Sequence, residues 1–197
     1  MHGLVNKSIQ CFVRDTYGAA TWAAVVREAR LGFDSFEPML TYDPALTEAV
    51  VAAAAHQLQR SRETLLEDMG TYLVSHPNVE ALRRLLRFGG VGFVDFLHSL
   101  EDLPGRARLA VADLDLPDLE LTDTGPDCFA LRCRSPLRGV GHVMMGLLRA
   151  MADDYGALVL LDIQTGSGLG EGDVIAIQVL ETRFAEGRRF DLAARAG

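Results

Sequence analysis

Apolar residues recur at helical spacing through the first half of the chain. They form one stripe that stops near Gly18 and a second that stops at Gly32. Two more helices are predicted from their opening residues. "DPALTEAVVAAAAHQLQ" begins with Asp43 as N-cap and Pro44 at the first helical position, and "SRETLLEDMGTYLVSH" begins with Ser61 as N-cap. The next helix, "NVEALRRLLRFGG", ends on paired glycines, which are a strong stop signal.

A further helix is predicted from "FVDFLHSLEDLPGR", residues 93–106. Its apolar face consists of Phe93, Phe96, Leu97, Leu100 and Leu103. We expect Pro104 and Gly105 to end or bend this helix, because proline lacks an amide proton and its ring clashes with the preceding turn. His98 lies six positions before Pro104, so the two side chains should face different ways.

The pattern changes from helical to alternating after about Leu116. "LELTD" and "CFALRCRS" read as strands joined by the turn "TGPD", and "ALVLLDIQ" and "DVIAIQVLE" read as a second hairpin. An apolar helix over residues 139–155 lies between the hairpins. Segregated helices and antiparallel strands predict an α+β fold, with an N-terminal helical subdomain packed on a C-terminal part that has a four-stranded antiparallel sheet and helices.

Composition and charge narrow the classes of function. The chain has 197 residues, 49% hydrophobic and 23% charged, which fits one domain with a sizeable core. A net charge of −8 argues against nucleic-acid binding, which needs a basic face. No apolar run approaches the ~20 residues of a membrane span. There is no secretory signal and no CxxC pair among the three cysteines, so we expect a reducing, cytoplasmic location.

Two stretches carry candidate chemistry. His142 begins an apolar helix that contains methionines, and it is either a metal ligand or an N-terminal helix residue bonded to a nearby carbonyl. The methionines are expected to be core residues. "RCRSPLRG" places Arg132, Arg134 and Arg138 around Ser135 at a strand-to-helix junction. This group either recognises a carboxylate or phosphate or is a solvated strand edge, and the sequence favours neither alternative.

Several runs in order along the chain resemble one family. They are "MHGLVNKSIQCFVRDTYG", "LTYDPALTEAVVAAAA", "LLEDMGTYLV", "FLHSLEDL" and "GLLRAMADDYG". Together they are similar to the heme nitric-oxide/oxygen-binding (H-NOX, HNOB) family, the sensor domain of soluble guanylate cyclase and its bacterial relatives. The resemblance implies a single domain over residues 1–181, helical over 1–65 and mixed α/β over 66–181, followed by a tail at 182–197.

The resemblance also implies a heme, whose iron is held in the family by one histidine in a Leu-Asp-x-Leu-His run. The matching run here is "LEDLP", so Pro104 occupies the position of the ligand. Proline has no lone pair to offer iron, whereas a gas-sensing ferrous heme needs a neutral imidazole. Pro117 matches the family proline that presses on the porphyrin, which supports this alignment.

Other heme contacts of the family are altered as well. The family holds the heme propionates with a Tyr-x-Ser-x-Arg run, and the matching run here is "CRSPL". Cys133 replaces the tyrosine, Ser135 is kept, and Leu137 replaces the arginine. Arg138 comes one residue late. On the other side of the porphyrin, Val143 falls near the gas-facing position with His142 beside it.

Three hypotheses follow. The favoured one is a cytoplasmic sensor or regulatory binding module with the H-NOX fold and a modified heme pocket, which does not bind heme in the family's way. Its partner would be a signalling protein such as a histidine kinase or a cyclic-dinucleotide enzyme. Either an apolar or tetrapyrrole small molecule held by Ser135 and Arg138 replaces the heme, or the core has filled in. The alternative is a heme-binding nitric-oxide sensor with His142, His98 or Cys133 as substitute axial ligand. The third is an enzyme using Cys133 as a thiolate between arginines, although no partner base is visible.

Overall fold

Helices make up the first half of the molecule. The computed structural model describes residues 1–111, 113–114, 116–166 and 172–188. Within them the helices before the sheet are α1 (Gly3–Tyr17), α2 (Ala19–Glu28), α3 (Pro44–Gln57), α4 (Arg62–Ser75), α5 (Glu80–Arg87), α6 (Phe93–His98) and α7 (Leu103–Ala110).

The predicted starts of α3 and α4 are confirmed. The Asp43 carboxylate accepts a hydrogen bond from the Ala45 amide at 2.9 Å, and Pro44 is in the first turn of α3. The Ser61 hydroxyl accepts one from the Thr64 amide at 3.1 Å. Each cap satisfies an amide that has no partner within its helix, so these two boundaries could be predicted from local sequence.

The helix predicted over residues 93–106 is wrong in its continuity and in the place of its break. α6 ends at His98, a 3₁₀ turn follows at Leu100–Asp102, and α7 begins at Leu103. At Ser99 the ladder tightens to 3₁₀ spacing. The Ser99 amide is shared between the Asp95 and Phe96 carbonyls, each at 3.1 Å, and the Ser99 hydroxyl also donates to the Phe96 carbonyl at 2.7 Å. Pro104 therefore lies in the first turn of α7, where a missing amide proton costs nothing, and it starts a helix rather than ending one.

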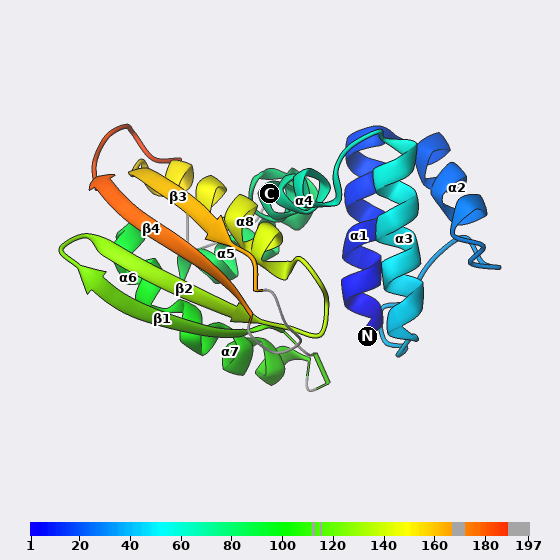
Figure 1. The fold of residues 1–197 in the computed structure, drawn as a ribbon, viewed down its shortest axis with the longest axis horizontal. Helices are drawn as coiled ribbons and strands as arrows, with labels where there is room; N and C mark the ends of the chain where they lie inside the picture. Colours follow the sequence, from blue (N-terminus) through cyan, green and yellow to red (C-terminus); the bar gives the residue numbers. More distant parts are fainter. Residues whose placement is uncertain (112, 115, 167–171, 189–197) are drawn as a thin grey trace, which may run out of the picture.

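The second half of the molecule contains the sheet. β1 (Asp118–Gly125) pairs with β2 (Cys128–Arg134), and β3 (Leu158–Gln164) pairs with β4 (Asp173–Glu181), both antiparallel. β2 also pairs with β4, which gives one sheet in the order β1-β2-β4-β3. α8 (Val140–Tyr155) lies behind the sheet in Figure 1, together with α5 and α6. The predicted α+β fold with two hairpins is confirmed.

The buried apolar side chains form two clusters. One joins α1, α2, α3 and part of α4, and the other joins the sheet with α5, α6, α7 and α8. α4 contributes to both, with Leu65, Leu66, Met69 and Tyr72 in the first cluster and Val74 in the second. Figure 1 shows α4 between the N-terminal helices and the sheet. The predicted division into residues 1–65 and 66–181 stays a prediction.

α4 and α8 touch backbone to backbone through two glycines. A Cβ atom on Gly70 would lie 2.0 Å from the Val143 carbonyl oxygen, and one on Gly146 would lie 1.9 Å from the Glu67 carbonyl oxygen. Neither position can accept a side chain unless a helix moves. This contact fixes α8 against the helix that both clusters share.

None of the helices in the described residues is long and apolar enough to cross a membrane.

Candidate functional site

A cleft of about 790 Å³ opens where the N-terminal helices meet the β2–α8 connection. Its volume falls in the range of ordinary small-molecule sites. The residues that line it come from α3 and α4, the β2–α8 loop, the start of α8 and the two ends of the β3–β4 connection. They are Glu48, Arg62, Glu63, Leu66, Cys133–Val140, His142, Thr165, Gly166, Gly172 and Asp173.

The cleft brings together residues singled out from the sequence, namely Cys133, Arg134, Ser135, Leu137, Arg138 and His142. Pro117 lies just before β1 and is half-buried. Pro104 and Pro117 are not among the described residues that line the cleft, and neither is His98. His98 is exposed, and its ring meets the Phe129 ring edge-on at a centroid distance of 5.7 Å.

His142 is the most deeply buried polar side chain of the cleft wall, with 7% of its surface exposed. Its Nδ1 atom lies 3.5 Å from a carboxylate oxygen of Glu67 on α4. The other Glu67 oxygen binds Arg149 at 3.1 Å. A carboxylate against Nδ1 fixes the ring and leaves Nε2 as the remaining polar atom of the imidazole.

The N-terminus of α8 is already capped by a carboxylate. Asp173, the first residue of β4, accepts a hydrogen bond from the Gly141 amide at 3.0 Å and one from the Gly166 amide at 3.4 Å. A Cβ on Gly141 would lie 2.5 Å from the Cβ of Asp173, so this approach requires glycine. The positive end of α8 therefore holds an acidic side chain of the chain itself.

Cys133 is not the activated thiol that the arginine neighbours in the sequence suggested. Its side chain is 1% exposed and belongs to the apolar cluster behind the sheet. Burial, with a smaller effect from Asp173, raises the pKa of the Cys133 thiol to about 12. Arg132 and Arg134 face the opposite side of the sheet and pair with Glu120. The thiol is neutral, so the enzyme hypothesis loses its nucleophile.

Ser135 and Arg62 form hydrogen bonds with the backbone of the loop between β2 and α8. The Ser135 hydroxyl accepts a hydrogen bond from the Leu137 amide at 3.1 Å. Arg62 binds Glu48 at 2.9 Å and donates to the Arg138 carbonyl at 3.0 Å. The Arg138 side chain itself is exposed. Arg138 is thus the guanidinium of this loop best placed to meet a ligand that enters the cleft.

α6 and α8 pack closely on each other. Phe96 and Leu97 of α6 and Leu148 of α8 belong to one cluster, and each has 0% of its surface exposed. An empty space of porphyrin size beside them would leave part of each side chain accessible to water. Met144, Met145 and Met151 are buried in the same cluster, as expected for core methionines.

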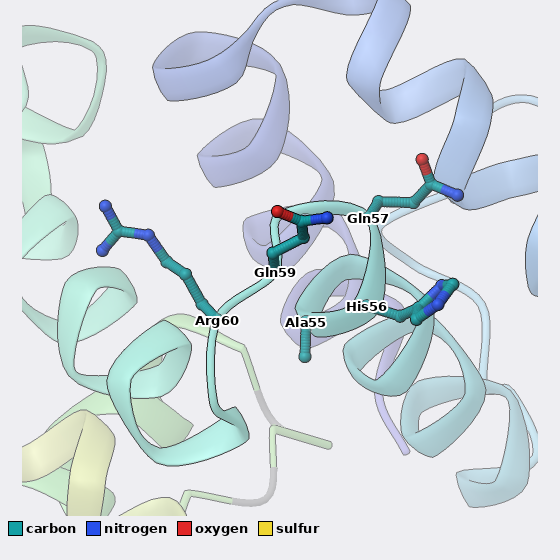
Figure 2. A pocket seen from close by; sticks show the side chains of 5 residues that line it. All are labelled: Ala55, His56, Gln57, Gln59 and Arg60. Atoms are coloured by element: carbon teal, nitrogen blue, oxygen red, sulfur yellow. The ribbon is translucent and has the colours of Figure 1, made fainter.

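A second hollow, of about 490 Å³, lies at the C-terminal end of α3. Figure 2 shows that Arg60 extends away from His56 and Gln57. Each of these three is already bonded to an acid, since His56 and Gln57 bind Glu28 and Arg60 binds Asp68. Diverging, paired side chains do not make a ligand site, and we assign none here.

Three features of the cleft region were missed from the sequence. Asp173 was taken for an ordinary first strand residue, and Glu67 and the Gly70–Gly146 contact involve partners far apart in the chain. Only the structure brings these pairs together. Over the described ranges no group of three or more His, Cys, Asp or Glu side chains could hold a metal ion.

The comparisons with known proteins agree with this fold. The sequence model of one family, described as Haem-NO-binding (HNOB), matches residues 2–162. Soluble guanylate cyclase 89Db of Drosophila melanogaster is 23% identical over 155 residues, covering 79% of this chain and 23% of that protein. Soluble guanylate cyclase gcy-31 of Caenorhabditis elegans is 23% identical over 168 residues, covering 83% and 24%. The chain spans about a quarter of the length of these relatives.

Solved structures share the fold at low sequence identity. The crystal structure of an Fe(II) unliganded H-NOX protein from K. algicida has a TM-score of 0.79 at 15% identity, covering 94% of this chain and all of that one. An H-NOX protein from S. oneidensis in the Fe(II)NO ligation state has a TM-score of 0.76 at 17% identity, covering 92% and 100%. The chain belongs to the H-NOX (HNOB) family, a family of heme-based gas sensors.

Proposed function

We propose that this chain is a sensor or regulatory binding module that does not hold heme through a proximal histidine. The observation that carries the proposal is Pro104, which is buried in the first turn of α7. The resemblance puts the iron ligand of the family at this position. A proline there offers iron no lone pair, so the bond that a gas would break in the family's mechanism cannot form.

Packing supports the same conclusion. Phe96, Leu97 and Leu148 fill the space between α6 and α8 with no accessible surface left. A porphyrin could enter only by displacing these side chains, at the cost of the apolar contacts they make. The residues present therefore do not fit a heme seated between α6 and α8.

The positions that hold the heme propionates in the family are also unsuited to them here. Asp173 accepts a hydrogen bond from the Gly141 amide at the start of α8. The Ser135 hydroxyl accepts one from the Leu137 amide and keeps its own proton to donate. Cys133 offers a buried neutral thiol. A heme propionate placed at the start of α8 would meet the Asp173 carboxylate, and like charges at close range repel.

Titration of the purified chain with hemin tests the proposal. We expect no saturable, equimolar Soret band. A sharp band with a one-to-one end point would contradict the proposal. The His56→Ala variant is a matched control for surface binding, because His56 is exposed and lies outside the cleft.

A heme sensor with a substitute ligand is the second candidate, and one observation favours it. His142 is nine-tenths buried in the cleft wall with its Nδ1 atom against Glu67, which is the arrangement that many metal-binding histidines show. If hemin does bind, His142→Ala should abolish the band while His56→Ala and His98→Ala keep it. A band that survives in His142→Ala would remove this candidate.

The wider role rests on the family. The matched relatives are guanylate cyclases, so the module is expected to act on a signalling partner such as a histidine kinase or a cyclic-dinucleotide enzyme. An apolar or tetrapyrrole small molecule in the cleft, held by Arg138 and Ser135, would bias the two halves that α4 joins. A cytoplasmic location belongs to the same proposal.

A further inference from the structure

The segment after β4 returns onto the last turn of α8. The Gly156 carbonyl accepts hydrogen bonds from the Phe184 amide at 2.8 Å and the Ala185 amide at 3.1 Å, and the Asp154 carbonyl accepts one from the Arg188 amide at 3.0 Å. We call residues 182–188 the strap. Its backbone bonds join the end of the sheet to the end of a helix on the covered face.

Two glycines let the strap approach this closely. A Cβ on Gly156 would lie 2.2 Å from the Ala185 carbonyl oxygen, and Gly156 has φ +75°. A Cβ on Gly187 would lie 2.7 Å from the Asp154 carbonyl oxygen. The obstacles are backbone atoms, which cannot turn aside as a side chain can. The strap and α8 are therefore fitted to each other without room for a methyl group.

The Asp154 carboxylate is surrounded by three arginines at this contact. Its side chain is 0% exposed and binds the Arg83 guanidinium on α5 at 2.8 Å. Arg87 of α5 lies 3.6 Å from the other carboxylate oxygen, and Arg188 of the strap lies 4.0 Å from the oxygen that Arg83 binds. A buried carboxylate must be compensated by such partners, so the three elements α5, α8 and the strap are held at one point.

The end of α8 is also tied to the loop after α5. The Tyr155 hydroxyl donates to the Gly90 carbonyl at 3.0 Å, and the Arg87 guanidinium stacks over the Tyr155 ring at 3.9 Å. The strap thus rests on a surface whose position follows that of α8.

α8 connects this point to the cleft. His142 in the cleft wall and Asp154 under the strap lie twelve residues apart on one continuous helix, or about 18 Å. Between them, Gly146 sits against the α4 backbone. A rigid helix that is in contact with a neighbour near its middle can rotate about that contact. A displacement of one end then displaces the other end in the opposite direction.

We propose that α8 is a lever that links the strap to the cleft through the pivot at Gly146, so that the hold of the strap on α8 follows movement at the cleft. The input through the cleft rests on the proposed function. We call the contacts of Asp154 and the end of α8 with the strap the clamp. The clamp and the lever do not need a ligand, so both are tested in the ligand-free protein.

Hydrogen exchange of the strap amides tests the clamp. We expect Asp154→Asn to make the amides of Phe184, Ala185 and Arg188 exchange about tenfold faster, because the carboxylate that gathers the arginines has lost its charge. The matched control is Asp153→Asn, whose side chain is exposed on the same turn and should leave the exchange unchanged. Unchanged strap exchange in Asp154→Asn would overturn the proposal.

Exchange in α1 to α3 reports whether a variant is still folded. If Asp154→Asn also accelerates exchange there, Gly187→Ala replaces it, since a Cβ at 187 meets only the end of α8. Glu186→Ala, at an exposed neighbouring strap position, is its control. Gly187→Ala should loosen the strap about tenfold and Glu186→Ala should not. Equal exchange in the two variants would contradict the clamp.

The lever is tested at the pivot. Gly146→Ala must push α8 away from Glu67. We expect faster exchange at the strap, which contacts α8 at Asp154, eight residues along the helix from Gly146. Gly105→Ala in α7 is the control, because nothing lies within 4 Å of a Cβ there. A strap that exchanges normally in Gly146→Ala would refute the lever. Hemin binding is a separate measurement, so a failure of the proposed function leaves these results interpretable.

Discussion

Single residues in the cleft take their chemistry from burial rather than from their neighbours in the sequence. Cys133 stands between two arginines along the chain, which suggested a thiolate. Strand alternation places Arg132 and Arg134 on the exposed face of β2 and the Cys133 side chain in the core. The sequence shows which residues are adjacent in the chain, whereas the pKa of a thiol depends on which atoms surround it in space.

The Cys133 thiol should resist alkylation in the folded protein. A pKa raised from 9.0 to about 12 lowers the thiolate fraction at neutral pH about a thousandfold, and burial blocks the reagent as well. Iodoacetamide at pH 8 followed by peptide mass analysis should leave Cys133 unmodified until the protein is unfolded with urea. The half-buried Cys128 on the same strand is the internal control. Fast modification of Cys133 in the folded chain would contradict the assignment.

Asp15 should make stability depend on acid pH. Its carboxylate accepts hydrogen bonds from the Tyr72 hydroxyl at 2.7 Å and from Asn78 at 2.9 Å, and these bonds lower the pKa of Asp15. A lowered pKa in the folded state stabilises the fold above pH ~4, and that stabilisation is lost as the pH falls through the folded-state pKa.

The Tyr72→Phe variant isolates this contribution. It removes one donor, so it should cost about 1 kcal/mol at pH 7. The difference from the wild type should shrink as the pH falls below ~4. Urea unfolding across this pH range is the measurement, and a difference that stays constant would show that Asp15 is not the acceptor responsible.

Among the elements, those defined by local signals could be predicted and those defined by contacts could not. The caps at Asp43 and Ser61 and both hairpins follow from residues a few positions apart. At the break, the Ser99 hydroxyl donates to the Phe96 carbonyl, and no hydrophobic or capping pattern in the sequence predicts a break there. The cap that Asp173 provides to α8 joins residues 32 positions apart, so local sequence carries no trace of it.

The α4–α8 crossing should depend on its glycines. Gly70→Ala places a methyl group against the Val143 carbonyl, and we expect it to cost about 2–4 kcal/mol because two backbones must separate. Gly105→Ala, in open space within α7, should instead stabilise the protein by about 0.5–1 kcal/mol through helix propensity. Urea unfolding of both variants gives the comparison. A mild effect at Gly70 would mean that the helices can part at little cost.

At the scale of the whole molecule, two apolar clusters share one helix. α4 gives Leu65, Leu66 and Met69 to the N-terminal cluster and Val74 to the C-terminal one. A helix buried on two sides shows no single apolar stripe, which is why the sequence indicated that α4 exists but not that it joins the halves. The order of elements was predictable, whereas a filled core was only one of two alternatives, because the burial of Phe96, Leu97 and Leu148 depends on contacts between distant residues.

Restoring the histidine alone should not restore a heme site. In Pro104→His, the side chains of Phe96, Leu97 and Leu148 would still pack α6 against α8 with no surface exposed. We expect hemin titration of this variant to give no equimolar Soret band, as for the wild type. A ferrous histidyl heme spectrum in Pro104→His would show that the core opens readily and that the proline is the only barrier.

The glycine contact between α4 and α8 has a consequence for how such a chain can change over generations. Where a prosthetic group forms the seam between two halves, losing the group leaves a void, and the fold is lost with it. Here the seam at Gly70 and Gly146 is main chain against main chain. A chain with this seam can keep its architecture whether or not a prosthetic group lies between its halves.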